Sequence, residues 1–321
     1  MRAPCYACLP FHCWRRCGAT SITGAKPGGT SSSNSSAGNS DMSETLPAVI
    51  IPAHNEELSI ATLLRALMPG VHKQRYTITV ACNGCSDRTA EIVRYHFPQV
   101  CCIELEQASK VAALNAAENA ELGFPRIYID ADVVISSSAV EALIDACQNS
   151  SNPTVVAPRA VPKNEGCEWI VRTYYQAWQK TVFFRLHGFG SGVYALNRAA
   201  REKFERFPNL ISDDGFVRQI LNYDNIRVVE SAKSLVKSPR DLAGLIRIKT
   251  RSKLGSLEIR DSENKIGNGP QFKQRFLQRP TITERLVYGG INLLALLNAH
   301  RLIRKQGRAH WLRDETSRHS A

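Results

Sequence analysis

The feature that most constrains the fold is a regular alternation of short apolar runs with helix-forming segments between residues 48 and 148. Each run has the length and the branched composition of a buried strand. Strand–helix units of roughly 30 residues are typical of βαβ folds. The alternation therefore predicts an α/β fold with a mainly parallel sheet and helices on both faces. The four predicted strands are residues 48–53, 77–82, 100–105 and 127–131.

Polar start signals mark the predicted helices. Asn55, Glu56 and Glu57 supply a cap and first-turn acids for a helix with Leu58, Leu63, Leu64 and Leu67 at helical spacing. Ser86 and Asp87 start the next helix, which extends to about residue 97. Further helices are expected at 109–121 and 138–148.

Beyond residue 150 the pattern becomes mixed. We expect strands near 153–158 and 226–231, a Gly-rich strand within 188–197, and helices at 167–184 and 212–221. Trp169, Tyr174, Tyr175 and Trp178 recur near helical spacing, which favours core packing over sugar stacking. From residue 241 onward the sequence reads as helical and basic.

Composition divides the chain into three parts. Residues 1–45 are Gly-, Ser- and Asn-rich and are predicted to be disordered. Residues 46–240 form the α/β domain, and 241–321 form a basic helical extension. The net charge is +12, and residues 240–321 carry 17 Lys and Arg against 7 Asp and Glu. Because the basic residues collect outside the domain without interleaved aromatics, no nucleic-acid partner is predicted.

Cysteine usage indicates a reducing, cytoplasmic compartment. Six of the ten cysteines lie singly or in pairs within predicted elements, as buried free thiols do. Cys5, Cys8, Cys13 and Cys17 have a spacing that could hold zinc, but no partnering structured segment follows them. No apolar run reaches the roughly 18 residues of a membrane span. The nearest is 286–300, which glycines, asparagines and a histidine interrupt.

Chemically reactive side chains follow several of the predicted strands. AHNEE follows the first strand, CNGCSD the second, and DAD (130–132) the fourth. Side chains two residues apart on a strand face the same way, so Asp130 and Asp132 point together. Two facing carboxylates suit Mg²⁺ or Mn²⁺, which prefer carboxylate and phosphate oxygens, and this implies a phosphorylated ligand. The alternative is a solvated turn that caps the next helix.

Six segments in order resemble a family 2 inverting glycosyltransferase of the GT-A fold over residues 47–251. They are PAVIIPAHNEE (47–57), VACNGCSDRTAEI (80–92), SKVAALNAAENA (109–120), YIDADV (128–133), FGSGVYALNR (189–198) and ISDDGFVRQI (211–220). The resemblance implies transfer of one sugar from a nucleoside-diphosphate sugar, a UDP-sugar in our prediction, to a glycan or lipid-linked acceptor.

The resemblance also implies where the donor binds. Pro52, Asn55 and Glu56 would line the nucleotide pocket. Asn83 stands where the family usually has a base-contacting Asp, which leaves the base less certain. Asp87 would contact the ligand or start the following helix.

Four further basic and acidic residues would act on the diphosphate. Lys110 would lie near the donor or remain a solvated lysine. Asp130 would contact the ribose or the metal, and Asp132 would ligate the metal. Arg251 lies where many relatives have a basic–aromatic motif that clamps the diphosphate, but Ser252 replaces the aromatic. That replacement argues against a processive synthase.

Asp213 and Asp214 match the family's paired acids beside the acceptor. The resemblance implies that Asp214 is the general base, with Asp213 as the second choice. The alternative is that both acids only complement a helix N-terminus after Ser212.

Two other functions stay open. One is a catalytically inactive relative that acts as a binding or scaffold protein. The other is a nucleotidyltransferase, but AHNEE replaces the Gly- and Arg-rich phosphate loop expected there.

The basic extension also has alternative readings. It can be a packed helical cover, a phosphate-binding lid, or an interfacial helix at 284–305. In the last case Leu286, Leu293, Leu297 and Ile303 would enter lipid, and Arg301, Arg304 and Lys305 would meet headgroups. The protein would then be peripheral on the inner face of the membrane.

Overall fold

The computed structural model describes residues 45–118, 122–187, 192–221, 225–266 and 275–306. The predicted disordered segment and its four cysteines lie outside the described residues, apart from residue 45. Residues 188–191 of the predicted Gly-rich strand also lie outside them.

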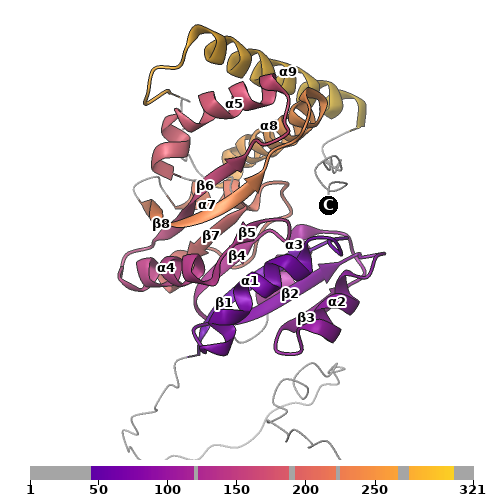
Figure 1. The fold of residues 1–321 in the computed structure, drawn as a ribbon, viewed down its shortest axis with the longest axis vertical. Coiled ribbons are helices and arrows are strands. Elements are labelled where there is room, and N and C mark those ends of the chain that lie inside the picture. Colours follow the sequence, from indigo (N-terminus) through magenta and orange to yellow (C-terminus); the bar gives the residue numbers. More distant parts are fainter. Residues whose placement is uncertain (1–44, 119–121, 188–191, 222–224, 267–274, 307–321) are drawn as a thin grey trace, which may run out of the picture. The chain divides into compact units, whose positions relative to one another are not determined.

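The described strands form one eight-stranded sheet (Figure 1). Its order is β3-β2-β1-β4-β7-β6-β8-β5. The strands are β1 (Pro47–Ala53), β2 (Thr77–Asn83), β3 (Cys101–Leu105), β4 (Gly123–Ile129), β5 (Val134–Ile135), β6 (Val155–Lys163), β7 (Val193–Leu196) and β8 (Ile226–Lys237). Strands β1 to β4 pair in parallel, as predicted. β7 pairs antiparallel with both β4 and β6, so the second half of the sheet is mixed.

Both faces of the sheet are covered, because alternate residues of β1 enter different cores. Val49 and Ile51 pack with α1 (Ile60–His72), α2 (Thr89–His96) and α4 (Ser137–Gln148). Ile50 packs on the other side with α3 (Lys110–Glu118), α6 (Arg198–Arg201) and α7 (Asp213–Ile220). The predicted α/β fold with helices on both faces is confirmed.

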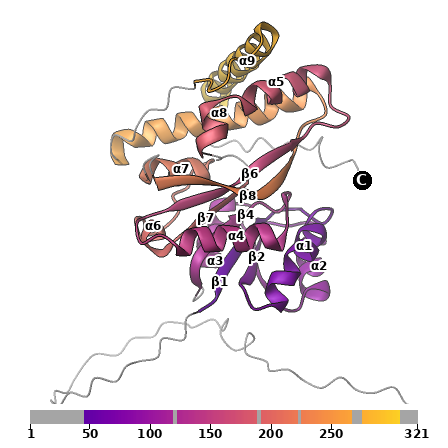
Figure 2. The same cartoon turned by 60° about the vertical axis from the view of Figure 1, so that its left-hand side comes forward.

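A separate helical layer lies beyond β6 and β8 (Figure 2). It contains α5 (Trp169–Gln179), a π-helical turn η1 (Phe183–His187), α8 (Leu242–Ile266) and α9 (Ile282–Gln306). Tyr174, Tyr175 and Trp178 are buried in its core, so the prediction of core packing holds for these three. Trp169 is exposed instead.

Of the first two predicted helix starts, one is wrong and the other is partly confirmed. The first helix begins at Ile60 rather than near Leu58, which is exposed. Asn55 adopts a positive φ of 51° and its Oδ1 accepts from the backbone N–H of Ser86, so it does not cap that helix. The second helix begins at Thr89, and the residue before it, Arg88, makes no side-chain cap. The Asp87 carboxylate accepts from the Thr89 N–H at 3.0 Å, as predicted for a helix-start acid, and also from the Glu57 N–H at 3.1 Å.

Candidate functional site

The DAD segment begins directly after β4, where the backbone stays in register with β7. The Asp130 N–H donates to the Gly192 carbonyl at 2.8 Å. Gly192 has a φ of +71°, and a Cβ there would lie 2.7 Å from Val133 Cγ2 and 3.1 Å from Asp130 Oδ2. Glycine is therefore required at residue 192 both for its backbone conformation and to leave room beside the Asp130 carboxylate.

Lys110 connects the DAD segment to the paired acids. It is the first residue of α3, and its Nζ lies 2.6 Å from Asp130 Oδ1 and 2.8 Å from Asp213 Oδ1. The Lys110 side chain is 23% exposed and that of Asp213 is 4% exposed. The lysine predicted near the donor is thus an ion-paired residue between two carboxylates and is not a solvated one.

Tyr194 on β7 completes the environment of Asp213. Its hydroxyl donates to Asp213 Oδ2 at 2.9 Å, so Lys110 and Tyr194 together engage both oxygens of this carboxylate. Burial and the neighbouring Asp213 charge raise the pKa of Tyr194 well above its ordinary value. Tyr194 therefore remains a neutral hydrogen-bond donor at physiological pH.

The buried charges shift one another. Partial burial and the Asp213 and Asp132 charges raise the pKa of Asp130 to about 6, because together they outweigh the effect of Lys110. Burial opposes the charge on Lys110, but the two carboxylates outweigh it and raise the pKa of Lys110. Burial also works against ionisation of Asp213, but Lys110 and Tyr194 outweigh it and lower the pKa of Asp213. Lys110 therefore keeps its proton, and Asp213 stays ionised.

Asp214 has a different environment from Asp213. Its Oδ1 accepts from the Ser212 hydroxyl at 2.5 Å and from the Gly215 N–H at 2.7 Å. Its side chain is partly exposed, and among the described residues its Oδ2 accepts no hydrogen bond. Ser212 caps α7 as predicted, since its hydroxyl also accepts from Gly215 N–H at 3.1 Å. Both oxygens of Asp213 are thus bonded to neighbouring side chains, whereas Oδ2 of Asp214 has no partner among the described residues.

Helix α8 closes over the start of α7. Glu258 accepts a hydrogen bond from the Ile211 N–H at 2.7 Å. A Cβ at Gly255 would lie 3.0 Å from Ser212 Cβ, so the two backbones approach closely. Arg251, the predicted diphosphate clamp, is half-buried on α8 one turn before Gly255. The predicted C-terminal extension therefore contributes to this site.

Asn83, at the end of β2, is buried with one unsatisfied acceptor. Its Nδ2 donates to the Ala53 carbonyl at 2.8 Å. Among the described residues its Oδ1 accepts no hydrogen bond, although the side chain is 1% exposed. A buried carbonyl without a donor is costly, so this side chain carries an unpaired acceptor at the end of β2.

The other residues predicted for the nucleotide pocket join the loops after β1 and β2. Asp87 accepts from the Glu57 N–H at 3.1 Å and from the Thr89 N–H at 3.0 Å. Partial burial alone would raise the pKa of Asp87, but its hydrogen bonds with Thr89 and Glu57 outweigh this and lower it. Glu56 donates its N–H to Thr89 Oγ1 at 2.7 Å. Pro52 is buried within β1 beside Ala81 of β2. Asp87 and Glu56 therefore hold the two loops together, whereas Pro52 lies inside the sheet.

The DAD carboxylates fit a divalent cation only with help from a ligand. Asp132 is exposed, and the Asp130 side chain is 38% exposed. Within the described ranges, no group of three or more His, Cys, Asp or Glu side chains could hold a metal. Two carboxylates suit Mg²⁺ or Mn²⁺ that takes its remaining oxygens from a diphosphate and water.

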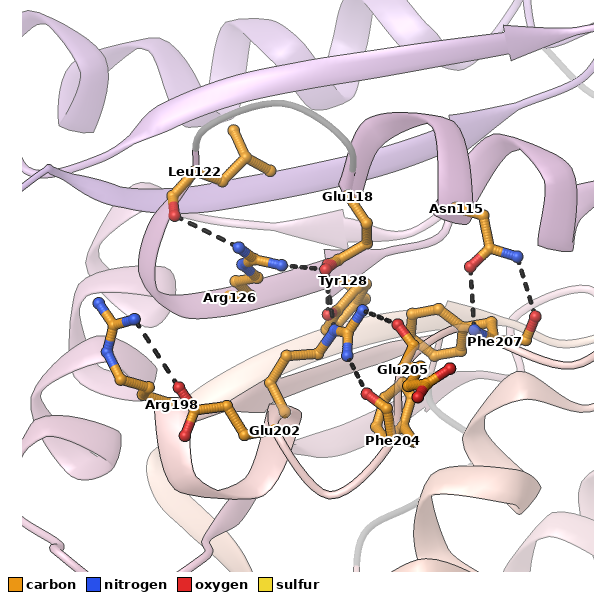
Figure 3. Close-up of polar contacts among 11 residues, drawn as sticks. Asn115, Glu118, Leu122, Arg126, Tyr128, Arg198, Glu202, Phe204, Glu205 and Phe207 are labelled. Atoms are coloured by element: carbon orange, nitrogen blue, oxygen red, sulfur yellow. Dashed lines mark hydrogen bonds and ion pairs between the residues drawn. The ribbon is translucent and has the colours of Figure 1, made fainter. Parts of the chain in front are cut away.

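A second buried network behind the site was not predicted (Figure 3). Glu118, at the end of α3, accepts from the Tyr128 hydroxyl at 2.7 Å and from Arg201 Nε at 2.8 Å, and it also pairs with Arg126. Tyr128 stacks on Tyr194 with ring centroids 4.7 Å apart. The two ends of α3 are thus fixed by separate ion-pair networks. The register of β4 against β7, which no single segment reveals, places these tyrosines side by side.

Comparisons with known proteins agree with this geometry. The chain matches the model of glycosyl transferase family 2 over residues 48–205. No curated protein matches the sequence. Among solved structures, the mannosyltransferase PcManGT from Pyrobaculum calidifontis, in complex with GDP-Man and Mn²⁺, aligns at 16% identity and a TM-score of 0.52. That alignment covers 84% of this chain and 77% of the other. 

A mycobacterial protein aligns at 15% identity and a TM-score of 0.50, over 77% of this chain and 89% of the other. At these identities the two structures support only the fold, and the family assignment rests on the match to the family model. The chain is a glycosyltransferase, and through residues 48–205 it belongs to glycosyl transferase family 2.

Proposed function

We propose that this enzyme is an inverting glycosyltransferase that moves one sugar from a nucleoside-diphosphate sugar to a hydroxyl of a glycan or lipid-linked acceptor. Residues 46–240 would carry the donor and catalytic groups, and 241–321 would form the extension over the acceptor side. The observation that carries the proposal is the contrast between the paired acids. Asp213 is engaged by Lys110 and Tyr194, whereas Asp214 is partly exposed beside it.

Asp214 is the general base in this mechanism. An acceptor hydroxyl is a weak nucleophile, so Asp214 takes its proton as the oxygen attacks the anomeric carbon of the donor. The bond from that carbon to the diphosphate oxygen breaks in the same step, and the nucleoside diphosphate leaves. Attack from the opposite side inverts the anomeric centre, so an α-linked donor yields a β-linkage.

The donor side of the site would bind the nucleotide and its diphosphate. Asn83 Oδ1 would accept a hydrogen bond from the base, and Asp130 and Asp132 would hold Mg²⁺ or Mn²⁺. That cation, when bound, neutralises charge on the departing diphosphate. Lys110 adds a fixed positive charge beside Asp130, and Arg251 supplies a further cation from α8.

We predict a UDP-sugar as donor and a cytoplasmic location for the enzyme. PcManGT binds GDP-Man, so guanosine donors must be tested as well. The described cysteines are free thiols, which supports a reducing compartment.

The test is turnover of a panel of UDP- and GDP-sugars with Mn²⁺, measured as release of nucleoside diphosphate. Asp214→Asn and Asp132→Ala should each lower kcat by about 100-fold or more. Asp145→Asn, an exposed acid on α4 that pairs with Arg75, is the matched control and should leave kcat unchanged.

Other outcomes decide between the alternatives. If Asp214→Asn is fully active while Asp213→Asn binds donor but is inactive, the general base is Asp213. Donor binding without turnover on any glycan or lipid-linked acceptor would favour an inactive relative with a binding role.

A further inference from the structure

The outward face of α9 is apolar at its centre and carries basic residues at both ends. Five large apolar side chains on it are exposed by between 47% and 80% of their area. We call them the α9 apolar face: Ile282, Leu286, Leu293, Leu294 and Leu297. Gly289 and Gly290 lie between them, and a Cβ at either would meet nothing within 4 Å. The apolar residues and glycines of this face recur mainly at three- and four-residue intervals, so they lie along one side of the helix.

The opposite side of α9 is fixed to the enzyme. Glu284 pairs with Lys180 at 2.7 Å, and Tyr288 stacks on Tyr174 with centroids 5.0 Å apart. Asn292 donates to the Tyr174 hydroxyl at 3.3 Å. Further along the same side Ile291, Ala295 and Ala299 are buried. The expectation of a packed helical cover therefore describes this side of α9, which lies at the edge of the helical layer in both views (Figures 1 and 2).

The helix is apolar on both sides. By length and composition alone, Ile282–Lys305 could cross a membrane. The ion pair, the stacked tyrosines and the buried side chains hold it against α5 and α8, so crossing would require breaking all of them. A large apolar face exposed to water is unfavourable, and a helix that is apolar on all sides is normally buried in a protein core or in a membrane.

The exposed charges that flank the α9 apolar face within residues 275–306 are all positive. Arg279 and Arg285 lie at its beginning, and Arg301, Arg304 and Lys305 at its end, and all five are exposed. Within residues 275–306 the single acidic residue is Glu284, which faces inward and is paired with Lys180. The face therefore offers apolar contact and positive charge without a carboxylate.

We propose that α9 docks this face on an anionic lipid surface, with the helix lying parallel to the membrane plane. The leucines would enter the boundary between headgroups and acyl chains, and the flanking Arg and Lys side chains would contact the phosphates. Three of the four residues expected to enter lipid, Leu286, Leu293 and Leu297, lie on this face, whereas Ile303 is partly covered. Leu294 and Ile282 take part as well.

A second copy of the chain is a poorer occupant. Two α9 helices packed through this face would bring their basic ends together with no acidic side chain of α9 to offset them. An anionic bilayer offers what a second copy lacks, namely negative charge together with an apolar interior.

Docking would also place the acceptor side of the enzyme near the membrane. Helix α8 packs against α9 and also approaches Ser212 at the start of α7. One consequence rests on the proposed function, namely that the acceptor is lipid-linked rather than a soluble glycan. The docking itself does not depend on it.

The test is flotation of the full chain with vesicles of phosphatidylcholine, with and without phosphatidylglycerol. Binding is expected to the anionic vesicles. Leu293→Ser/Leu294→Ser/Leu297→Ser should weaken it by roughly tenfold per leucine. Arg301→Gln/Arg304→Gln/Lys305→Gln should weaken it by roughly 100-fold, since each basic residue contributes about fivefold near an anionic surface.

Matched controls come from exposed residues elsewhere. Leu58→Ser/Tyr95→Ser removes two exposed apolar side chains, and Lys73→Gln/Lys203→Gln/Lys233→Gln removes three exposed charges. Both controls should bind like the parent, and thermal melts should show that all variants are folded.

Three results would overturn the proposal. The first is an absence of vesicle binding by the folded parent. The second is equal loss of binding in the control variants. The third is a dimer in sedimentation velocity that the leucine variant dissociates without any vesicle binding, which would assign the face to a second copy. Because none of these readouts uses sugar transfer, failure of docking and failure of the proposed activity remain distinguishable.

Discussion

The Nζ atom of Lys110 lies 2.8 Å from Oδ1 of Asp213 and 2.6 Å from Oδ1 of Asp130. One ammonium group thereby joins the DAD segment after β4 to the first residue of α7. The two carboxylates, of which that of Asp213 is buried, would otherwise repel each other. This arrangement links the position of the paired acids to that of the donor-side acids.

Removing that ammonium should destabilise the fold. Lys110→Met leaves two carboxylates facing each other, and loss of one partner from a buried pair costs roughly 3 kcal/mol. Chemical denaturation measures the free energy of unfolding. Asp213→Asn in the same chain should restore part of the loss, because it removes one of the repelling charges. Equal destabilisation in the single and double variants would show that the charges do not interact.

The Tyr194 hydroxyl should matter for activity and not only for stability. Tyr194→Phe keeps the ring stacked on Tyr128 but leaves Asp213 Oδ2 without its donor, at a cost of about 1–3 kcal/mol. The control is Tyr76→Phe, which removes a buried hydroxyl that donates to the Leu67 carbonyl away from the site. Both variants should lose stability, but only Tyr194→Phe should lower kcat of the folded enzyme. An unchanged kcat would restrict Tyr194 to a structural role.

Gly192 should not tolerate a side chain. Gly192→Ala combines an unfavourable positive φ with a Cβ 2.7 Å from Val133 Cγ2. Gly166→Ala is a close control, because Gly166 has the same φ of +71° and open space around it. We expect both to lower the melting temperature, with Gly192→Ala the more destabilised by roughly 1–3 kcal/mol. Equal effects would mean that the DAD segment relaxes away from the added methyl group.

The network at the far end of α3 should be a stability element. Glu118→Ala would leave Arg126 and Arg201 without their shared carboxylate, at a cost of about 3–5 kcal/mol. Glu118→Gln keeps the shape and one acceptor oxygen, and should cost less. Urea unfolding separates the two variants. If Glu118→Ala unfolds at the same urea concentration as the parent, the attraction within the ion pairs only offsets the cost of removing the charges from water.

Lys249 should make stability depend on pH in the alkaline range. It lies over the rings of Tyr174, Tyr175 and Trp178, and burial together with the nearby Lys253 charge lowers its pKa from 10.5 to about 8. Between these values the unfolded chain binds the proton more tightly, so stability should rise with pH across that interval. The melting temperature of the parent relative to Lys249→Met should therefore increase from pH 8 to pH 10.5. The same comparison for the exposed Lys73→Met is the control, and an identical trend there would contradict the assignment.

Much of the fold follows from local patterns. The alternation of β1 to β4 with α1 to α4 can be predicted from apolar runs and turn residues, because a strand buried on both faces must be continuously apolar. The end of a predicted strand pointed to Asp130 and Asp132, and the family resemblance pointed to Asp213 and Asp214, whose roles stay predictions. Helix starts were less predictable. Asn55 bonds to the neighbouring loop instead of capping its own helix, and Asp87 bonds to the neighbouring loop in addition to its own helix start. Only the tertiary structure supplies the partners in the neighbouring loop.

By itself the sequence determined which elements form and which residue types end them, because both depend on neighbours a few positions away. The tertiary structure decided what those residues do. It brought Lys110, Tyr194 and Asp213 together from three separate elements, and so distinguished Asp213 from the adjacent Asp214. It also turned one apolar side of α9 inward and left the other exposed. Such distinctions depend on distances between segments far apart in the chain, which no local pattern encodes.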